Sequence, residues 1–208
     1  MGCDIYIVVE RQSENGQWER VWTHDWQVPD PVGTPERFRE RNYDLFGILA
    51  DVRNGHGFAG CVTGSGWPSI APNRGVPADS TVTPDEHNEY AIGDHSFSWV
   101  SLDELKAFDW DGVTADAYGI VTREEYTRMQ LAGESRPNQW CGGISGRDVL
   151  IVTPEQLMTA PIPPFSHVRV AWKETAREGT YDWAGQVLPW LESLAAGQPL
   201  RLVFGFDS

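Results

Sequence analysis

A two-residue turn signal near the start of the chain constrains the fold more than any other sequence feature. The segment CDIYIVVERQSENGQWERVWTH contains two runs of β-branched and aromatic residues on either side of Asn15-Gly16. Asn-Gly readily adopts the positive φ angles of a tight turn whose twist matches that of two paired strands. We therefore expect residues 3–10 and 17–23 to form an antiparallel hairpin.

The first strand of this hairpin presents two different faces. Side chains alternate along a strand, so Ile5, Ile7 and Val9 share one face, whereas Asp4 and Tyr6 are neighbours on the other. The apolar face suits a core, and the second face makes Asp4 available to a site.

A helix is expected next, in the segment PERFRERNYDLFGILADVRNG. Phe38, Tyr43, Phe46 and Leu49 recur there near helical spacing. The residues that follow, 54–93, are rich in Gly and Pro and show no sustained period. A connection of this length inside a compact domain is usually either functional or without fixed structure.

Capping motifs predict three shorter helices further along. Ser101 with Glu104, and Thr122 with Glu125, match the capping box that satisfies the first N–H groups of a helix. Thr153 precedes a proline, which favours a helix start there. The other expected elements are strands near 148–152, in HVRVAWKET and in LRLVFGFD, and a helix in YDWAGQVLPWLESLAAG that Pro189 kinks and Gly197 ends.

This order of elements predicts an α+β fold. The start is rich in strands, helices follow in the middle, and the end reads strand–helix–strand. We expect one domain over residues 1–208, with a mixed or antiparallel sheet in which the first and last strands pair, several short helices and a long central loop. No repeat, charge block or linker divides the chain.

Charge limits the classes of partner. The 30 acidic and 16 basic residues give a net charge of −14, which repels nucleic-acid backbones and acidic membranes. Such a surface either keeps a protein soluble or mimics nucleic acid. The three cysteines lie far apart, the first residues lack the pattern of a signal peptide and no apolar run reaches membrane length, so we expect a cytoplasmic protein. We assign no cofactor.

The segment GDHSFSWVSLDEL is the densest group of candidate site residues. If it is extended, Asp94, Ser96 and Ser98 point one way and His95 and Trp99 the other. A histidine titrates near neutral pH and can transfer a proton or bind a metal. It can equally be a loop residue bonded to a backbone carbonyl, and a single histidine has no spacing that decides between these roles.

Three other features of the sequence bear on possible chemistry. The glycines of NGHGFAGCVTGSGWPS suggest a phosphate loop, but Trp67-Pro68 follows where such a loop needs a Lys and a helix start. Cys3 has no base nearby in sequence, so packing explains it better than nucleophilic chemistry. Arg41, Arg53 and Arg74 could grip a phosphate or carboxylate beside aromatic rings, or could lie on the surface in solvated ion pairs.

The chain resembles a family of small phage and prophage-type proteins over nearly its whole length. The blocks that carry the resemblance are MGCDI, RNYDLFGILADVRN, NRGVPAD, GDHSFSWVSLDEL and RLVFGFD. The resemblance implies kinship and, if the chain is phage-encoded, the cytoplasm of a host cell; it implies no particular activity. Members of this family usually carry a histidine where this chain has Tyr6, and this departure weakens any metal or acid–base role for that position. The matching residues are Cys3, Asp4, Arg41, Asn42, Tyr43, Arg74, Gly75, Asp94, His95, Ser96 and Trp99.

Three hypotheses for function follow. The first is a phage-type binding protein for a small nucleotide-like ligand that counters a host defence signal. The second is a metal-dependent hydrolase that uses Asp4 and His95, and the third is an acidic inhibitor of a host protein. The expected ligand-binding residues are Asp4, Arg41, Asn42, Tyr43, Arg74, Asp94, His95, Ser96 and Trp99.

No catalytic or metal-binding residue is assigned from the sequence. The sharpest structural expectation is that Asp4, Arg74 and His95 converge in one pocket. The long central connection must fold back over a face of the sheet, and it would bring Arg74 there and lead into His95.

Overall fold

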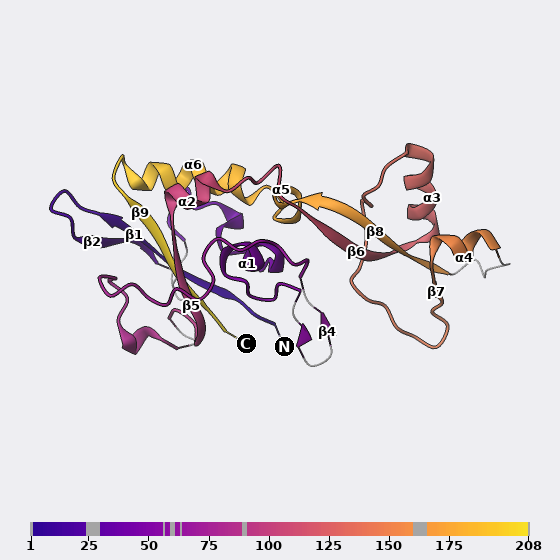
Figure 1. Ribbon diagram of the computed structural model, residues 1–208, viewed down its shortest axis with the longest axis horizontal. Coiled ribbons are helices and arrows are strands. Elements are labelled where there is room, and N and C mark those ends of the chain that lie inside the picture. Colours follow the sequence, from indigo (N-terminus) through magenta and orange to yellow (C-terminus); the bar gives the residue numbers. More distant parts are fainter. Residues whose placement is uncertain are drawn as a thin grey trace. The chain divides into compact units, whose positions relative to one another are not determined.

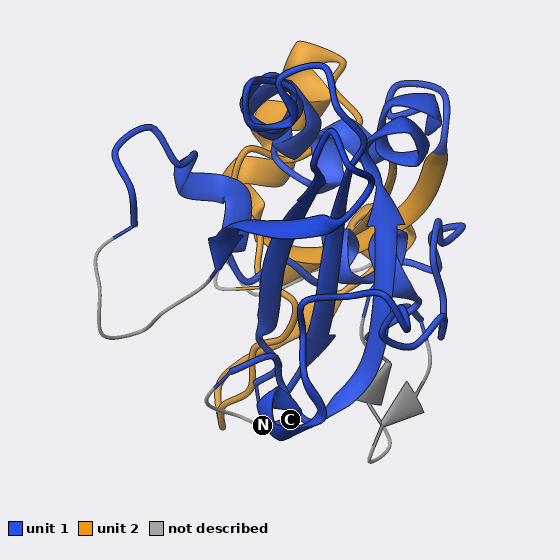
Figure 2. Cartoon of the chain, turned by 90° about the vertical axis from the view of Figure 1, so that its left-hand side faces the viewer, with its two compact units in different colours: residues 1–113, 175–208 blue, residues 114–174 orange. Residues whose placement is uncertain are grey.

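The structure is a computed structural model that describes residues 2–23, 30–55, 57–58, 61–62, 64–88, 91–159 and 166–207 (Figure 1). Its α+β class confirms the prediction. The described chain divides into two compact units, residues 1–113 with 175–208 (unit 1) and residues 114–174 (unit 2) (Figure 2).

The single domain expected from the sequence stays a prediction, because two compact units can belong to one domain. Strand β6 (Thr114–Thr122) begins at one boundary, and strand β8 (His167–Thr175) ends at the other. Regular strands therefore lie at both boundaries, and no Gly- or Pro-rich linker marks them in the sequence.

Unit 1 is built on a four-stranded antiparallel sheet with the order β2-β1-β9-β5. The predicted hairpin and the predicted pairing of the first and last strands are both confirmed. Gly16 has φ +82° in the hairpin turn, and Ile5 lies opposite Phe206 at the far end. The strands are β1 (Ile5–Gln12), β2 (Trp18–Thr23), β5 (His95–Ser101) and β9 (Leu200–Phe206).

Both faces of the central strands are covered. On one face, Phe206 packs edge-on against Phe46 of a helix, with ring centroids 5.2 Å apart. On the other face, Val8 and Val203 form an apolar cluster with Val82 of the long connection. The connection therefore folds back over the sheet, as the sequence analysis expected. Full burial of a side chain of this size contributes about 2 kcal/mol.

The helical segment after the hairpin is split, where one helix was expected. Asn42 has an extended backbone, and its Oδ1 accepts a hydrogen bond from Leu45 N at 2.9 Å. An asparagine that caps a helix must itself stand outside it, so the helix restarts at Tyr43. The helices of unit 1 are η1 (Glu36–Arg39), α1 (Tyr43–Ala50), η2 (Pro84–Glu86), α2 (Leu102–Ala107), α5 (Ala176–Gly179) and α6 (Trp183–Ala195); β3 (Gly57–Phe58) and β4 (Cys61–Val62) form a short ribbon.

Two of the predicted caps act as expected and one differs. Ser101 and Glu104 form the full capping box of α2, and Thr153 caps α4 (Pro154–Thr159). Thr122 also caps its helix, but the Glu125 carboxylate binds Arg128 and a loop N–H instead of completing the box.

Unit 2 is a small sheet with the order β6-β8-β7 and two helices. In β8, Val168, Val170 and Trp172 are buried while Arg169 and Lys173 are exposed, so one face forms the core. Strand β6 was not expected from the sequence. The other elements are β7 (Ile151–Val152), α3 (Arg123–Ala132) and α4 (Pro154–Thr159).

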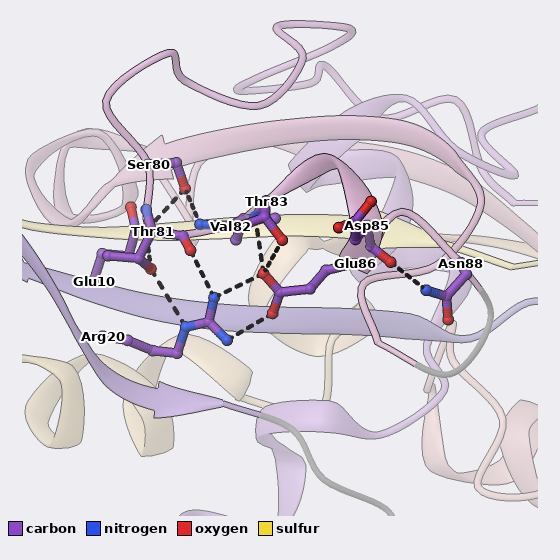
Figure 3. A network of polar contacts seen from close by, with 9 residues as sticks. All are labelled: Glu10, Arg20, Ser80, Thr81, Val82, Thr83, Asp85, Glu86 and Asn88. Atoms are coloured by element: carbon purple, nitrogen blue, oxygen red, sulfur yellow. Dashed lines mark hydrogen bonds and ion pairs between the residues drawn. The ribbon is translucent and has the colours of Figure 1, made fainter.

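A buried ion pair, together with the polar contacts of Glu10, Ser80 and Thr81 in Figure 3, holds the long connection against the sheet of unit 1. Arg201 Nε donates to Glu10 Oε2 at 2.7 Å, and these side chains are 5% and 0% exposed. Glu10 Oε1 also accepts hydrogen bonds from Ser80 and from the N–H and hydroxyl of Thr81. Nearby, Arg20 binds both Glu86 and the carbonyl of Thr81.

The same contacts determine the ionisation of Glu10. Burial by itself raises the pKa of Glu10, but the hydrogen bonds from Thr81, Arg201 and Ser80 together outweigh burial and hold the pKa below its ordinary value. The carboxylate is therefore charged in the folded protein.

We predict that Glu10→Gln lowers the free energy of unfolding by about 3 kcal/mol at pH 7, because it removes the buried counter-charge of Arg201 and leaves the guanidinium only the exposed carboxylate of Asp79. Since the folded-state pKa of Glu10 is depressed, the stabilisation is complete above the ordinary value of 4.5 and is lost as the pH falls below it. Urea unfolding of the variant and the wild type from pH 7 to pH 3 measures both effects.

Asp116→Asn is the matched control, because Asp116 pairs with Lys173 at 2.9 Å while both side chains are mostly exposed. We expect it to change stability little. Equal destabilisation by the two variants would contradict the role given to the buried pair.

Candidate functional site

The two ends of the folded chain meet beside α1 of unit 1 (Figure 1). The Asp207 carboxylate accepts a hydrogen bond from Asp4 N at 2.7 Å and one from the Tyr6 hydroxyl at 2.9 Å. The Asp207 N–H in turn donates to the Asp4 carbonyl at 3.2 Å. The carboxylate of Asp207 thus fixes the start of β1 against the end of β9.

His95 lies at the same end of the sheet. Its Nε2 is 3.0 Å from the Asp207 carbonyl, its Nδ1 is 2.9 Å from Ser96 Oγ, and its ring stacks on Phe206. A carbonyl only accepts, so Nε2 carries a proton and donates to it, while Nδ1 shares a hydrogen bond with the Ser96 hydroxyl. Both ring nitrogens are occupied locally, which is the backbone-bonded alternative considered for this histidine.

The expected alternation of side chains in β5 is wrong. His95 lies opposite Phe206, whereas Trp99 lies opposite Val203, and the pairing register shifts between these two pairs. Phe206 and Val203 are three positions apart and face opposite ways, so His95 and Trp99 do too. The cause is an inserted residue near Ser96, whose φ of +53° bends the strand.

Arg41 binds Asp4 with two parallel hydrogen bonds. Arg41 Nε and Nη2 lie 2.7 and 2.6 Å from the two Asp4 carboxylate oxygens. The Asp4 hydrogen bonds raise the pKa of Arg41 above its ordinary value. The side chains are 52% and 31% exposed, so the pair stands at the surface.

Tyr43 and Arg53 complete this group of side chains. The Arg53 guanidinium carbon is 5.9 Å from the centre of the Tyr43 ring, and Arg53 also hydrogen-bonds the thiol of Cys3. Both Tyr43 and Arg53 are half-buried. We call Asp4, Arg41, Tyr43, Arg53 and Asp207 the terminal cluster.

Sequence reasoning found part of this cluster. The sequence marks Arg53 as a possible anion ligand but not as one of the expected site residues, and it predicts no role for Asp207. The predicted pairing of the first and last strands held the missing signal for Asp207, because Ile5 opposite Phe206 brings residue 207 to residue 4.

Arg74 lies elsewhere, so the expected convergence of three residues is wrong. Asp4 and His95 both contact Asp207, but the Arg74 guanidinium binds Glu104 at 2.8 Å and lies 5.1 Å from the Trp99 ring centre. These partners stand at the opposite end of β5 from His95. Side-chain alternation predicts the face of the sheet on which a residue lies, but it does not predict which end of β5 Arg74 reaches.

Asn42 and Asp94 have local structural contacts. Asn42 is buried, caps α1 and donates to the Gly179 carbonyl at 3.1 Å. Asp94 is exposed, and its backbone N–H bonds the Phe206 carbonyl at 2.8 Å. The positions of these two residues are explained by the fold alone.

Metal binding has no visible framework in the described part of the chain. Within it, no three His, Cys, Asp or Glu side chains are grouped so that they could hold a metal ion. This statement does not extend to the whole glycine-rich segment, because its residues 56, 59, 60 and 63 lie outside the described ranges. Among the described helices, none has the length and apolar character needed to cross a membrane.

Comparison with known proteins adds no assignment. No family model matches the chain, and searches of curated proteins and of solved structures found no match either. The resemblance to phage and prophage-type proteins stays a prediction.

The environment of Cys3 predicts low thiol reactivity. Cys3 is fully buried, and burial raises the pKa of its thiol above the ordinary value, although Arg53 opposes the shift. Cys141 is exposed. In the native protein we expect iodoacetamide to modify Cys141 at least about tenfold faster than Cys3, because the reactive form is an accessible thiolate. Peptide mass mapping measures the two rates.

Unfolding in urea is the control, since it should make the two thiols comparable. Rapid native labelling of Cys3 would instead indicate an accessible, activated nucleophile at the start of the chain.

Proposed function

We propose that this chain is a binding protein that captures a small anionic, nucleotide-like ligand at the terminal cluster. The observation that supports the proposal is the grouping of Arg41, Tyr43 and Arg53 at the surface of a strongly acidic unit. Unit 1 contains 23 acidic and ten basic residues. Two guanidinium groups, one bound to Asp4 and the other over the Tyr43 ring, are an exception to that balance.

The ion pair between Arg41 and Asp4 is suited to exchange. Exposed ion pairs contribute little to stability, because water screens both charges. A phosphate offers the same two-oxygen geometry as the Asp4 carboxylate with more negative charge, so it can replace Asp4 on Arg41. The displaced carboxylate moves into solvent, which is adjacent to it.

The ring of Tyr43 supplies the second half of the recognition. A half-buried aromatic ring gives a nucleobase a stacking surface, and stacking of one base contributes about 1–3 kcal/mol. Arg53 lies over the same ring and can contact the phosphate or the base. A planar base joined to a phosphate therefore matches the cluster better than a bare inorganic anion.

Binding alone is sufficient for the biological role that we propose. A phage-type protein that removes a nucleotide signal of host defence needs affinity and abundance, and it needs no catalytic group. The occupied nitrogens of His95 agree with this role better than with the metal-dependent hydrolase.

We predict that a nucleotide ligand raises the melting temperature and that Arg41→Ala abolishes the shift. At a concentration 100 times Kd the stabilisation is about 2.7 kcal/mol, or roughly 5–10 °C for a protein of this size. Thermal shift assays with ATP, cyclic AMP and a cyclic dinucleotide measure it, with inorganic phosphate as a comparison.

Arg74→Ala is the matched control, since it removes another surface arginine that pairs with a glutamate, away from the cluster. Its shift should equal that of the wild type. The proposal fails if no nucleotide shifts the wild type, or if Arg41→Ala and Arg74→Ala respond alike.

A second candidate, the acidic inhibitor of a host protein, is favoured by the uneven distribution of charge and apolar groups. Unit 2 contains seven acidic and six basic residues, so nearly all the net charge belongs to unit 1. Of the seven exposed large hydrophobic residues that the described chain shows, five lie in unit 2. They are Tyr118, Leu131, Trp140, Leu150 and Met158.

For this candidate we predict that Leu131→Asp with Met158→Asp abolishes capture of a partner from a bacterial lysate. These side chains are 85% and 89% exposed, so the fold should tolerate the change. Val32→Asp, at an exposed position of unit 1, is the control and should leave capture intact. Quantitative mass spectrometry of the captured proteins decides, and equal capture by all variants would remove this candidate.

A further inference from the structure

Unit 1 contains a pocket that no part of the proposed function uses. It lies between the end of α2, the loop that follows, α5 and α6, and its volume is about 400 Å³. This size falls in the range of small-molecule sites. We propose that the pocket binds an organic cation, namely an amine or guanidinium carried on an aromatic or apolar body.

One wall of the pocket is aromatic and held in place. Phe108 and Trp110 meet edge-on, with ring centroids 4.9 Å apart. The Trp110 indole N–H donates to the Leu105 carbonyl at 2.8 Å, and its ring lies 5.7 Å from that of Trp183. Because Trp110 is buried, the half-buried Phe108 ring that packs on it is the surface that suits the apolar body of a ligand and attracts a cation to its face.

A second wall contains the backbone carbonyl of Gly185, which lacks the N–H donor that it would have in a regular helix. Pro189 lies inside α6 and has no N–H, so it cannot donate to the carbonyl of Gly185 one turn earlier. Both residues line the pocket. A proline inside a helix is destabilising, so its place on a pocket wall points to a use for the carbonyl that it leaves open.

The charges around the pocket favour a positive ligand. Asp109, Asp111 and Glu192 line it together with Lys106 and Arg177. Lys106 is paired with Glu192 at 2.6 Å, and Arg177 with Asp111 at 2.6 Å. Each of the two basic side chains therefore already binds a carboxylate of the protein.

Asp109 supplies the remaining negative charge. It accepts a hydrogen bond from Gly112 N at 2.8 Å, and the described residues show no ion pair to it. An incoming ammonium or guanidinium can donate to Asp109 and to the Gly185 carbonyl, whereas an anion would meet three carboxylates. The preference is opposite to that of the terminal cluster, so the two proposals stand or fall separately.

A pair of probes that differ in charge tests the proposal. Isothermal titration calorimetry with 2-phenylethylamine and with the neutral 2-phenylethanol should show that the amine binds at least about tenfold more tightly, because only the amine has a charged donor. Asp109→Asn keeps an acceptor for Gly112 N but removes the charge, and it should weaken amine binding at least about fivefold. Asp103→Asn, at an exposed site in the first turn of α2, is the matched control and should change neither probe.

Pro189→Ala separates a functional role of the proline from a structural one. Alanine restores the N–H to the Gly185 carbonyl, so the variant should melt at a higher temperature and yet bind the amine at least about threefold more weakly. Equal affinity for amine and alcohol, no binding of the amine at millimolar concentration, or unchanged amine binding in both Asp109→Asn and Pro189→Ala would overturn the proposal.

Discussion

Pairing of the first and last strands is the constraint on which the rest of unit 1 depends. Strand β9 lies between β1 and β5, and all seven of its residues are buried. Because the two strands run antiparallel, Ile5 lies opposite Phe206, and residues 4 and 207 meet at the end of the sheet. The terminal cluster depends on that register. The Asp207 carboxylate accepts a hydrogen bond from Asp4 N, and the Asp4 carboxylate in turn accepts one from Arg41. A shift of one residue would send these side chains to the other face.

Strands β1 and β9 also contribute the buried ion pair that holds the long connection, residues 54–93, against the sheet. Glu10 and Arg201 lie opposite each other on adjacent strands, and both are buried. Removing two charges from water is unfavourable unless their remaining hydrogen-bonding groups are satisfied. Ser80 and Thr81 of the connection donate to Glu10, and Asp79 accepts from Arg201. A segment rich in Gly and Pro therefore lies in one place over the sheet because polar contacts hold it there.

Local signals predicted much of this fold, and long-range geometry was harder to obtain. The Asn15-Gly16 turn, the Ser101 cap and the alternating strand HVRVAWKET are each determined by neighbours in sequence. The inserted residue at Ser96 has no such signal, and it reversed the face of His95 relative to Trp99. Arg74 was misplaced because folding of the connection over the sheet does not specify which strand end it reaches. For the site, Asp4 and Arg41 were found, whereas Asp207 needed the strand register as well as the pairing.

The central claim is that the terminal cluster, and not the other surface arginines, receives an anionic nucleotide. Arginine side-chain Nε–Hε signals in a ¹⁵N-resolved NMR titration with ATP test this claim directly, since each guanidinium reports on its own contacts. The chain contains 14 arginines. We expect the signals of Arg41 and Arg53 to shift and saturate together while that of Arg74 stays in place. Equal small shifts over all the arginines, or none at Arg41, would contradict the claim.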